Sequence, residues 1–156
     1  MTIYVMRHED RDMGNPLFDS PLTPEGLHNA ELAVDTLSTL NIAAVYTSPF
    51  LRAVQTILPF CSSEGMLARP EQSLYESMDS PLFTPDNSHY TWQDLPSEYH
   101  KWIDTKYVSM VGRVPVRETF VDVCARVRPF IQSLLRCHDK NVLLVTHMTI
   151  ADAIRS

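Results

Sequence analysis

The 156-residue sequence predicts an α/β protein, a three-layer α/β/α sandwich around a mostly parallel sheet. Short apolar runs rich in β-branched residues, at 2–6 and 142–146, are typical of buried parallel strands. Between such runs the apolar residues follow helical spacing, and this alternation favours helices that cross over the faces of a parallel sheet. The sequence shows no internal repeat, so we expect residues 1–156 to form a single domain.

The first predicted strand is followed by a loop and then by a helix. Gly14, Asn15 and Pro21 are typical of a loop that continues to residue 22. We expect the helix to begin at Thr23, because threonine is a good N-cap and Pro24 suits the first helical position. The face that we expect to be buried carries Leu27, Ala30, Val34, Leu37 and Leu40.

A second strand–helix pair follows directly. Residues 42–47 predict the strand, and Ser48-Pro49 repeats the signature of a cap followed by a proline. We therefore expect the next helix to begin at this point, and we expect Pro59 to end or kink it. Residues 66–75 predict a further short strand.

The periodicity is lost over residues 79–115, which are rich in proline and aromatic residues. This insertion fits two interpretations equally, a lid over a site or a packing loop with its own small apolar cluster. The next helix is predicted over 119–137, where Thr119 and Asp122 approximate a capping box. A last helix is expected to begin in 149–156, after the final strand.

The composition is ordinary for a globular protein, with 44% hydrophobic and 21% charged residues. We expect a cytoplasmic protein that does not bind membranes, since no apolar run approaches membrane-spanning length and the N-terminus does not resemble a signal peptide. The three cysteines are odd in number and lack C-x-x-C spacing, which is typical of reduced thiols. The net charge of −6 argues against nucleic acid as a partner, so a local positive pocket must attract any anionic ligand.

Chemically capable side chains follow each predicted strand. Arg7 and His8 follow the first strand, and Arg52 lies in the first turn of the helix after the second. Glu76 follows the short third strand and His147 follows the last. Ligands of open α/β sheets bind at this edge. If the first and last strands are neighbours, we expect Arg7 and the two histidines to converge there. Each of them alone is also typical of an ordinary core or surface residue.

Together these groups suit phosphoryl transfer. Guanidinium groups match phosphate oxygens, one imidazole can attack phosphorus, and the other can donate to a phosphoryl oxygen. A carboxyl group can protonate the leaving oxygen and later activate water. We therefore expect a phosphohistidine intermediate, with no metal and no other cofactor required.

Several motifs of the sequence occur in order at distances typical of one family. They are Met6-Arg7-His8, residues 21–26 and 47–56, Leu74-Tyr75-Glu76, Glu118-Thr119 with Asp122 and residues 126–129, and Val145-Thr146-His147. In this combination the chain resembles the histidine phosphatase superfamily, which has the phosphoglycerate mutase-like fold. The resemblance covers nearly the whole chain except 79–115.

The resemblance implies roles for the site residues. His8 would be the nucleophile that carries the phosphoryl group, and Glu76 would be the proton donor and then the base for water. Arg7, Arg52 and His147 would bind the phosphoryl group. His8 must be neutral to attack, and the two arginines would disfavour its protonated form.

Three features depart from the family pattern. Glu9 and Met148 stand where the family usually has glycine after each histidine. Glu9 and Asp10 would weaken anion binding or hold the histidine and arginine in place, and Met148 would narrow the floor of the pocket. The chain also ends nine residues after His147, where most relatives continue, so we expect a thin layer or a naturally short member.

The favoured function is a metal-independent phosphatase that acts on a small phosphate monoester or a phosphorylated protein. One alternative is phosphoglycerate mutase-type phosphoryl transfer, although the characteristic segment of the mutases is not found. The other is a non-catalytic phospho-ligand binder, which the residues after the two histidines motivate. We expect specificity to reside mainly in 79–115, and a dimer through a sheet edge or this segment is an option.

Overall fold

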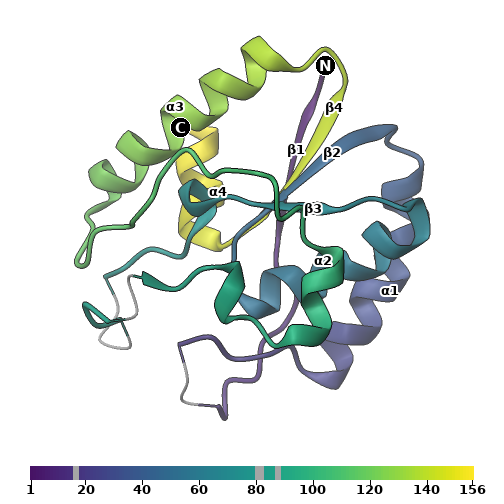
Figure 1. Ribbon diagram of the computed structural model, residues 1–156, viewed down its shortest axis with the longest axis horizontal. Helices are drawn as coiled ribbons and strands as arrows, with labels where there is room; N and C mark the ends of the chain where they lie inside the picture. The colour runs from purple at the N-terminus through teal and green to yellow at the C-terminus, as the bar shows by residue number, and fades with distance from the viewer. Residues whose placement is uncertain (16–17, 80–82, 87–88) are drawn as a thin grey trace.

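The computed structural model describes residues 1–15, 18–79, 83–86 and 89–156. Its centre is a four-stranded sheet in the order β1-β4-β2-β3, and each neighbouring pair is parallel. The strands are β1 (Ile3–Arg7), β2 (Ile42–Thr47), β3 (Ala68–Pro70) and β4 (Asn141–Thr146). The first and last strands of the chain therefore lie side by side, as Figure 1 shows.

The described part of the chain forms four α-helices. They cover the two faces of the sheet, as Figure 1 shows. On one face, α1 (Pro24–Ser38) packs with α2 (Leu51–Glu64), and on the other, α3 (Phe120–Cys137) packs with α4 (Met148–Arg155). The predicted α/β/α sandwich with a parallel sheet is thus confirmed.

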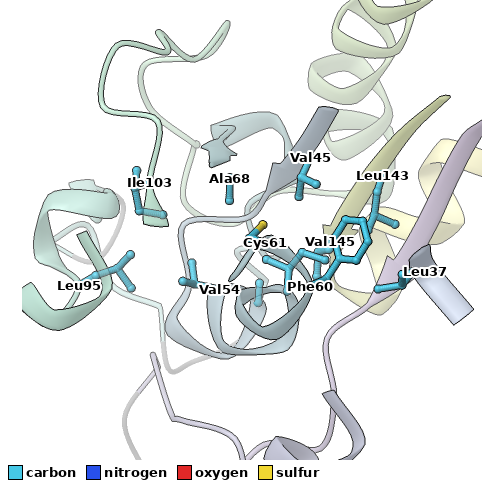
Figure 2. Close-up of a cluster of buried hydrophobic side chains, with 12 residues drawn as sticks. Leu37, Val45, Val54, Phe60, Cys61, Ala68, Leu95, Ile103, Leu143 and Val145 are labelled. Carbon is cyan, nitrogen blue, oxygen red and sulfur yellow. The ribbon is translucent and has the colours of Figure 1, made fainter. Parts of the chain in front are cut away.

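Side chains of β4 alternate between the two faces of the sheet, so this strand packs against both helix layers. Leu143 and Val145 belong to the apolar cluster of α1 and α2, whereas Val142 and Leu144 belong to that of α3 and α4. Figure 2 shows the first cluster, in which Phe60 of α2 packs beside Leu143 and Val145. Successive strand side chains point to opposite faces, so a strand that is apolar throughout must be covered twice.

The start of α1 follows the prediction closely. Thr23 is the N-cap, its side chain accepts a hydrogen bond from the Gly26 N–H at 3.0 Å, and Pro24 occupies the first turn. Of the predicted buried face, Ala30 and Leu37 are buried, but Leu27 is 42% exposed and lies outside the core. The helix stripe is therefore narrower than the spacing suggests.

The start of α2 differs from the prediction. Its N-cap is Phe50 rather than Ser48, and the helix begins at Leu51. The Ser48 hydroxyl instead bonds to a histidine of the site described below. Pro59 does not end the helix either, because α2 continues to Glu64 and ends at Gly65, whose φ of 65° is left-handed.

The chain between β3 and α3 forms no α-helix or strand among its described residues, but 3₁₀ helices occur, η1 (Gln72–Leu74), η3 (Trp92–Asp94) and η4 (Ser97–Trp102). Residues 80–82 and 87–88 of the 79–115 insertion lie outside the described residues. Tyrosine hydroxyls fasten the remainder to the body: Tyr90 to Asp19, Tyr99 to Gln55, and Tyr107 to Glu71. The described part of the insertion therefore packs against the sheet and α2.

Helix α3 has the predicted capping box, in which Thr119 and Asp122 bond reciprocally, and Pro129 lies inside the helix. The three cysteines are free thiols. Among the described residues, no helix has the length and apolar character needed to cross a membrane.

Candidate active site

The adjacent strands β1 and β4 place two imidazoles side by side. His8 follows β1 and His147 follows β4, and the two strands run in register to the pair Arg7 and Thr146. The backbone N–H of His8 continues the hydrogen bonding between the two strands by donating to the Thr146 carbonyl at 2.9 Å. As a result the two rings meet edge to face, with centroids 5.2 Å apart.

Arg52, in the first turn of α2, lies at the centre of the site and is only 1% exposed. Its Nε donates to His8 Nε2 at 3.2 Å, and its Nη2 donates to Glu76 Oε2 at 3.3 Å. Its Nη1 donates to the carbonyl of Phe18 at 3.0 Å. The guanidinium also lies over the Phe50 ring, 4.4 Å from its centroid, so packing and hydrogen bonds together fix its plane.

The hydrogen bonds of His8 determine its tautomer. Nδ1 lies 2.6 Å from the carbonyl oxygen of Glu9, which can only accept, so the proton is on Nδ1. The lone pair of Nε2 then points at Arg52 Nε–H. His8 therefore presents its nucleophilic nitrogen to the centre of the site.

The hydrogen bonds of His147 fix the opposite arrangement. Nδ1 lies 3.1 Å from Oε2 of Glu76 and donates to this carboxylate, and Nε2 accepts from the Ser48 hydroxyl at 2.8 Å. The contact of Arg52 Nη2 with Nδ1, at 3.4 Å, joins two N–H groups and is not a hydrogen bond in this tautomer. His147 therefore presents an N–H to the site, whereas His8 presents a lone pair.

Burial and charge keep both imidazoles neutral. Burial lowers the pKa of His8 to about 3, and the neighbouring His147 and the positive charges of Arg52 and Arg7 act in the same direction. Burial also lowers the pKa of the fully buried His147, against the nearby Glu76 carboxylate, which raises it. For Glu76, burial raises the pKa, but His147 and Arg52 outweigh it and hold the pKa below its usual range.

Arg126 of α3 positions the backbone that carries Glu76. Its guanidinium donates to the carbonyls of Ser73 at 2.6 Å and Tyr75 at 2.8 Å, and it pairs with the buried Glu118 at 2.5 Å. The guanidinium thus spans the turn after β3 and connects it to the start of α3. Both charges are buried, so removal of either residue would leave the other as an uncompensated buried charge, which is strongly destabilising.

A cavity of about 200 Å³ opens beside Arg52 and Glu76, and neither His8 nor His147 is among the residues that line it. Arg52 and Glu76 line it together with Arg11, Phe83 and Thr149. From the insertion, Asp79 also lines it, so the segment expected to control specificity reaches the site at this point.

The structure does not bring Arg7 into the same cavity. Its exposed side chain lines a neighbouring hollow of about 630 Å³ together with Asp10, Arg11 and Glu25. Arg11 is common to both hollows. The phosphate-binding role of Arg7 therefore stays a prediction, while its charge is near enough to affect His8.

The two residues that replace the usual glycines lie away from the cavity. The Glu9 backbone N–H donates to the Thr56 hydroxyl at 3.0 Å, and its side chain faces Asn29 of α1. Met148 is 51% exposed at the start of α4, and its neighbour Thr149 lines the cavity instead. The expectation that Met148 narrows the pocket floor is not supported by this arrangement.

His8, Glu76 and His147 offer ligand atoms within 4.8 Å of one another, a spacing that suits a metal ion. The Arg52 guanidinium, however, contacts all three. A divalent cation at this position would face a buried positive charge, whereas an anionic oxygen would be attracted by it. The donor set therefore favours an oxyanion.

Comparison with known proteins decides the family. A family profile described as the histidine phosphatase superfamily (branch 1) matches residues 3–156, nearly the whole chain. The chain belongs to this superfamily. The resemblance inferred from the motifs is thereby confirmed.

Individual relatives match this chain along most of their length. Phosphoserine phosphatase 1 of Hydrogenobacter thermophilus is 22% identical over 153 residues, which cover 93% of this chain and 70% of that protein. The structure of YhfR from Bacillus stearothermophilus superposes with a TM-score of 0.69 at 26% identity, covering 98% and 77% of the two chains. A mycobacterial glucosyl-3-phosphoglycerate phosphatase with inorganic phosphate has the same fold, with a TM-score of 0.66 at 24% identity, and covers 97% and 75%.

Three groups that the structure places at the site had no role predicted from the sequence. Arg11 lies three residues after His8, and this proximity to a predicted strand end was its only signal. Phe50 supports the Arg52 guanidinium, and Arg126 supports the turn before Glu76. Both residues lie within motifs of the sequence. The partners of Arg126 lie 53 and 51 residues away, whereas Phe50 lies two residues from Arg52 and only the fold shows that its ring faces the guanidinium.

Proposed function

We propose that this protein is a phosphatase that hydrolyses a phosphate monoester through a phosphohistidine on His8, with no metal ion required. The observation that carries the proposal is the neutral His8, whose Nδ1–H is bound to a carbonyl and whose Nε2 lone pair faces the Arg52 guanidinium. An imidazole in this tautomer is a nucleophile that faces an anion-binding group.

In the first step, Nε2 of His8 attacks phosphorus and the bond from phosphorus to the ester oxygen breaks. Glu76 supplies the proton to the leaving oxygen, so the products are an alcohol and an Nε2-phosphohistidine. For this purpose the Glu76 carboxyl must be protonated. A phosphate dianion beside it raises the pKa that His147 and Arg52 otherwise hold low, since a like charge disfavours ionisation.

In the second step, the Glu76 carboxylate removes a proton from water, and the water oxygen attacks the phosphorus. The bond from phosphorus to Nε2 breaks, inorganic phosphate leaves, and His8 returns to its neutral state. The same carboxyl group is therefore acid and then base, as microscopic reversibility requires. Glu76 therefore ends each turnover with the proton that it had at the start.

Three groups would stabilise the charge on the transferred phosphoryl group. Arg52 offers Nη2 and Nε, and His147 offers Nδ1–H, all of which now contact Glu76 or His8. Arg7, at the end of β1, would add a third donor from the side of the larger hollow. Forked, fixed donors of this kind act on charge that develops in the transition state.

For the substrate, the proposal is a small phosphate ester. A cavity of about 200 Å³ suits a phosphoryl group with a small leaving group. Relatives named phosphoserine phosphatase and glucosyl-3-phosphoglycerate phosphatase support this class, and Arg11 at the cavity wall is the residue that would meet an anionic leaving group. The free cysteines support a reducing, cytoplasmic site of action.

The test is turnover of p-nitrophenyl phosphate in the presence of EDTA by the wild type and by His8→Ala. We expect the variant to lose at least about a thousandfold in kcat, because it lacks the nucleophile. His28→Ala, on the exposed side of α1, is the matched control and should retain wild-type turnover.

Other outcomes separate the alternatives. Equal turnover in wild type and His8→Ala would refute the phosphohistidine mechanism. Phosphate binding without turnover in either protein would show a phospho-ligand binder. Isomerisation of a phosphoglycerate on addition of 2,3-bisphosphoglycerate would show a mutase.

A further inference from the structure

Three segments of the chain meet at the carboxylate of Asp19, which lies in the loop between β1 and α1. Oδ1 accepts a hydrogen bond from the Leu51 N–H at 2.7 Å, and Oδ2 accepts one from the Tyr90 hydroxyl. Leu51 is the first residue of α2, and Tyr90 belongs to the insertion. Asp19 therefore connects its loop to both the start of this helix and the insertion.

The same loop holds the guanidinium of Arg52. The Phe18 carbonyl accepts from Arg52 Nη1 at 3.0 Å, and Phe18 and Asp19 are consecutive, as are Leu51 and Arg52. Two neighbouring residues of the loop thus bind two neighbouring residues of the helix, one through its backbone N–H and one through its side chain. A shift of the loop would change the direction in which the guanidinium points.

Ring packing makes Tyr90 a second support for this loop. The Phe18 ring meets the Tyr90 ring edge to face at 5.2 Å and the Phe50 ring at 5.8 Å. Phe50 in turn lies under the Arg52 guanidinium. Tyr90 is itself fixed, because its carbonyl accepts from the side-chain amide of Gln72 at 3.0 Å.

We propose that Asp19 and Tyr90 are positioning residues that hold Arg52 in the orientation that binds the phosphoryl group. The inference rests on the proposed function, since it assigns Arg52 to that group. Asp19 binds the Leu51 N–H and the Tyr90 hydroxyl, so both residues act on Arg52 through the loop and the start of α2. Small misplacements of a binding group have large effects on rate, so loss of this support should reduce oxyanion binding and turnover.

Tyr99 offers a matched control. Its hydroxyl accepts from the Gln55 side-chain amide at 2.9 Å and fastens the same insertion to α2. The hydrogen bonds of Tyr99 lead through Gln55 to the Leu22 N–H, at the end of the loop next to α1. They involve neither Phe18 nor Asp19, which bind Arg52 and Leu51. Tyr90→Phe and Tyr99→Phe each remove one hydroxyl from the insertion and keep the ring.

The experiment compares these two variants in phosphate-free buffer. Affinity for orthovanadate is measured by calorimetry, kcat and KM by hydrolysis of p-nitrophenyl phosphate, and stability by urea unfolding. For Tyr90→Phe we expect the Kd of orthovanadate to rise about five- to tenfold and kcat/KM to fall by a similar factor, the size of one lost orienting hydrogen bond. For Tyr99→Phe both should stay within about twofold of wild type despite a comparable loss of stability.

Substitutions at Asp19 test the positioning of Arg52 independently of Tyr90. Asp19→Ala removes both acceptors and should weaken orthovanadate binding by about tenfold or more. Asp19→Asn keeps an oxygen for the Leu51 N–H, so it should recover part of the loss. Rescue of binding by the conservative variant indicates positioning of Arg52 rather than a general defect in folding.

Equal effects of Tyr90→Phe and Tyr99→Phe on orthovanadate affinity would overturn the inference, as would a Tyr90→Phe defect that vanishes when the folded fraction is taken into account. The proposed function fails separately, if the wild type binds orthovanadate but does not turn over substrate. In that case the vanadate affinities still decide whether Asp19 and Tyr90 position Arg52.

Discussion

The neutral state of His8 has a consequence for stability that can be measured without any substrate. In the unfolded chain a histidine has a pKa of about 6.5. In the folded protein, burial together with the positive charge of the arginines lowers the pKa of His8 to about 3. Between these two values the unfolded chain binds a proton that the folded protein excludes, so stability must fall as the pH falls from 6.5 towards 3.

The magnitude follows from the width of this window. Each pH unit within it corresponds to about 1.4 kcal/mol for one fully coupled group. Lowering the pH from 7 to 5 crosses roughly 1.5 units of the window, so His8 alone should cost about 2 kcal/mol of unfolding free energy. The lowered pKa of His147 acts in the same direction and adds to the loss in wild type.

Substitution of His8 measures how much of the pH-dependent loss of unfolding free energy this residue causes. Urea unfolding of wild type and His8→Gln is followed at pH 7 and pH 5 in phosphate-free buffer, because bound phosphate would stabilise the folded state. The difference between the two pH values should be smaller by about 2 kcal/mol in His8→Gln. A pH-independent change in the stability of the variant cancels in this comparison. His28→Gln, on the exposed side of α1, should keep the wild-type difference.

The reasoning would be refuted by a His8→Gln protein that loses as much stability between pH 7 and pH 5 as the wild type. That result would mean that His8 takes up its proton as readily in the folded protein as in the unfolded chain. The nucleophile would then be cationic below neutral pH, and attack on phosphorus by His8 would have to be abandoned at those pH values.

Three further predictions concern other residues. Glu76→Gln should lower kcat about a hundredfold for an alkyl phosphate but about tenfold or less for p-nitrophenyl phosphate, whose leaving group needs no acid, and equal losses would argue against an acid role. Arg126→Ala leaves Glu118 buried without its partner, so urea unfolding should show a loss of about 3–5 kcal/mol, and a loss below about 1 kcal/mol would contradict the buried pair. Gly26→Ala should destabilise by about 1–3 kcal/mol, because the added Cβ would lie 2.5 Å from the Asp10 carbonyl oxygen, and an unchanged urea midpoint would show that the loop and α1 separate freely.

The sequence was informative wherever the signal is local. Strands that are apolar on both faces stand out as short β-branched runs, and the residue after each such strand lies at the ligand edge of a parallel sheet. For this reason His8 and His147 could each be placed at the end of a strand from local context, whereas the pairing of β1 with β4 joins distant segments and comes from the fold. The capping box at Thr119 and Asp122 is local as well, and the structure has it.

The predicted start of α2 failed because it depends on contacts between distant segments. Ser48 looks like an N-cap, but its hydroxyl bonds to His147, 99 residues further along the chain. The first N–H of α2 is bound by the carboxylate of Asp19, 32 residues earlier. No pattern within a window of the sequence distinguishes a serine that caps a helix from one that supports a histidine.

The order of the strands separates the two groups that react from the two that bind the oxyanion in the proposed mechanism. Strands β1 and β3, which His8 and Glu76 follow, lie at the two edges of the described sheet, while Arg52 and His147 follow the inner strands β2 and β4. An edge strand is the part of a sheet that can open at the smallest cost in free energy. On gentle denaturation such a protein would stop turning over substrate while it still retains an oxyanion, so chemistry and anion binding would be lost in two stages rather than one.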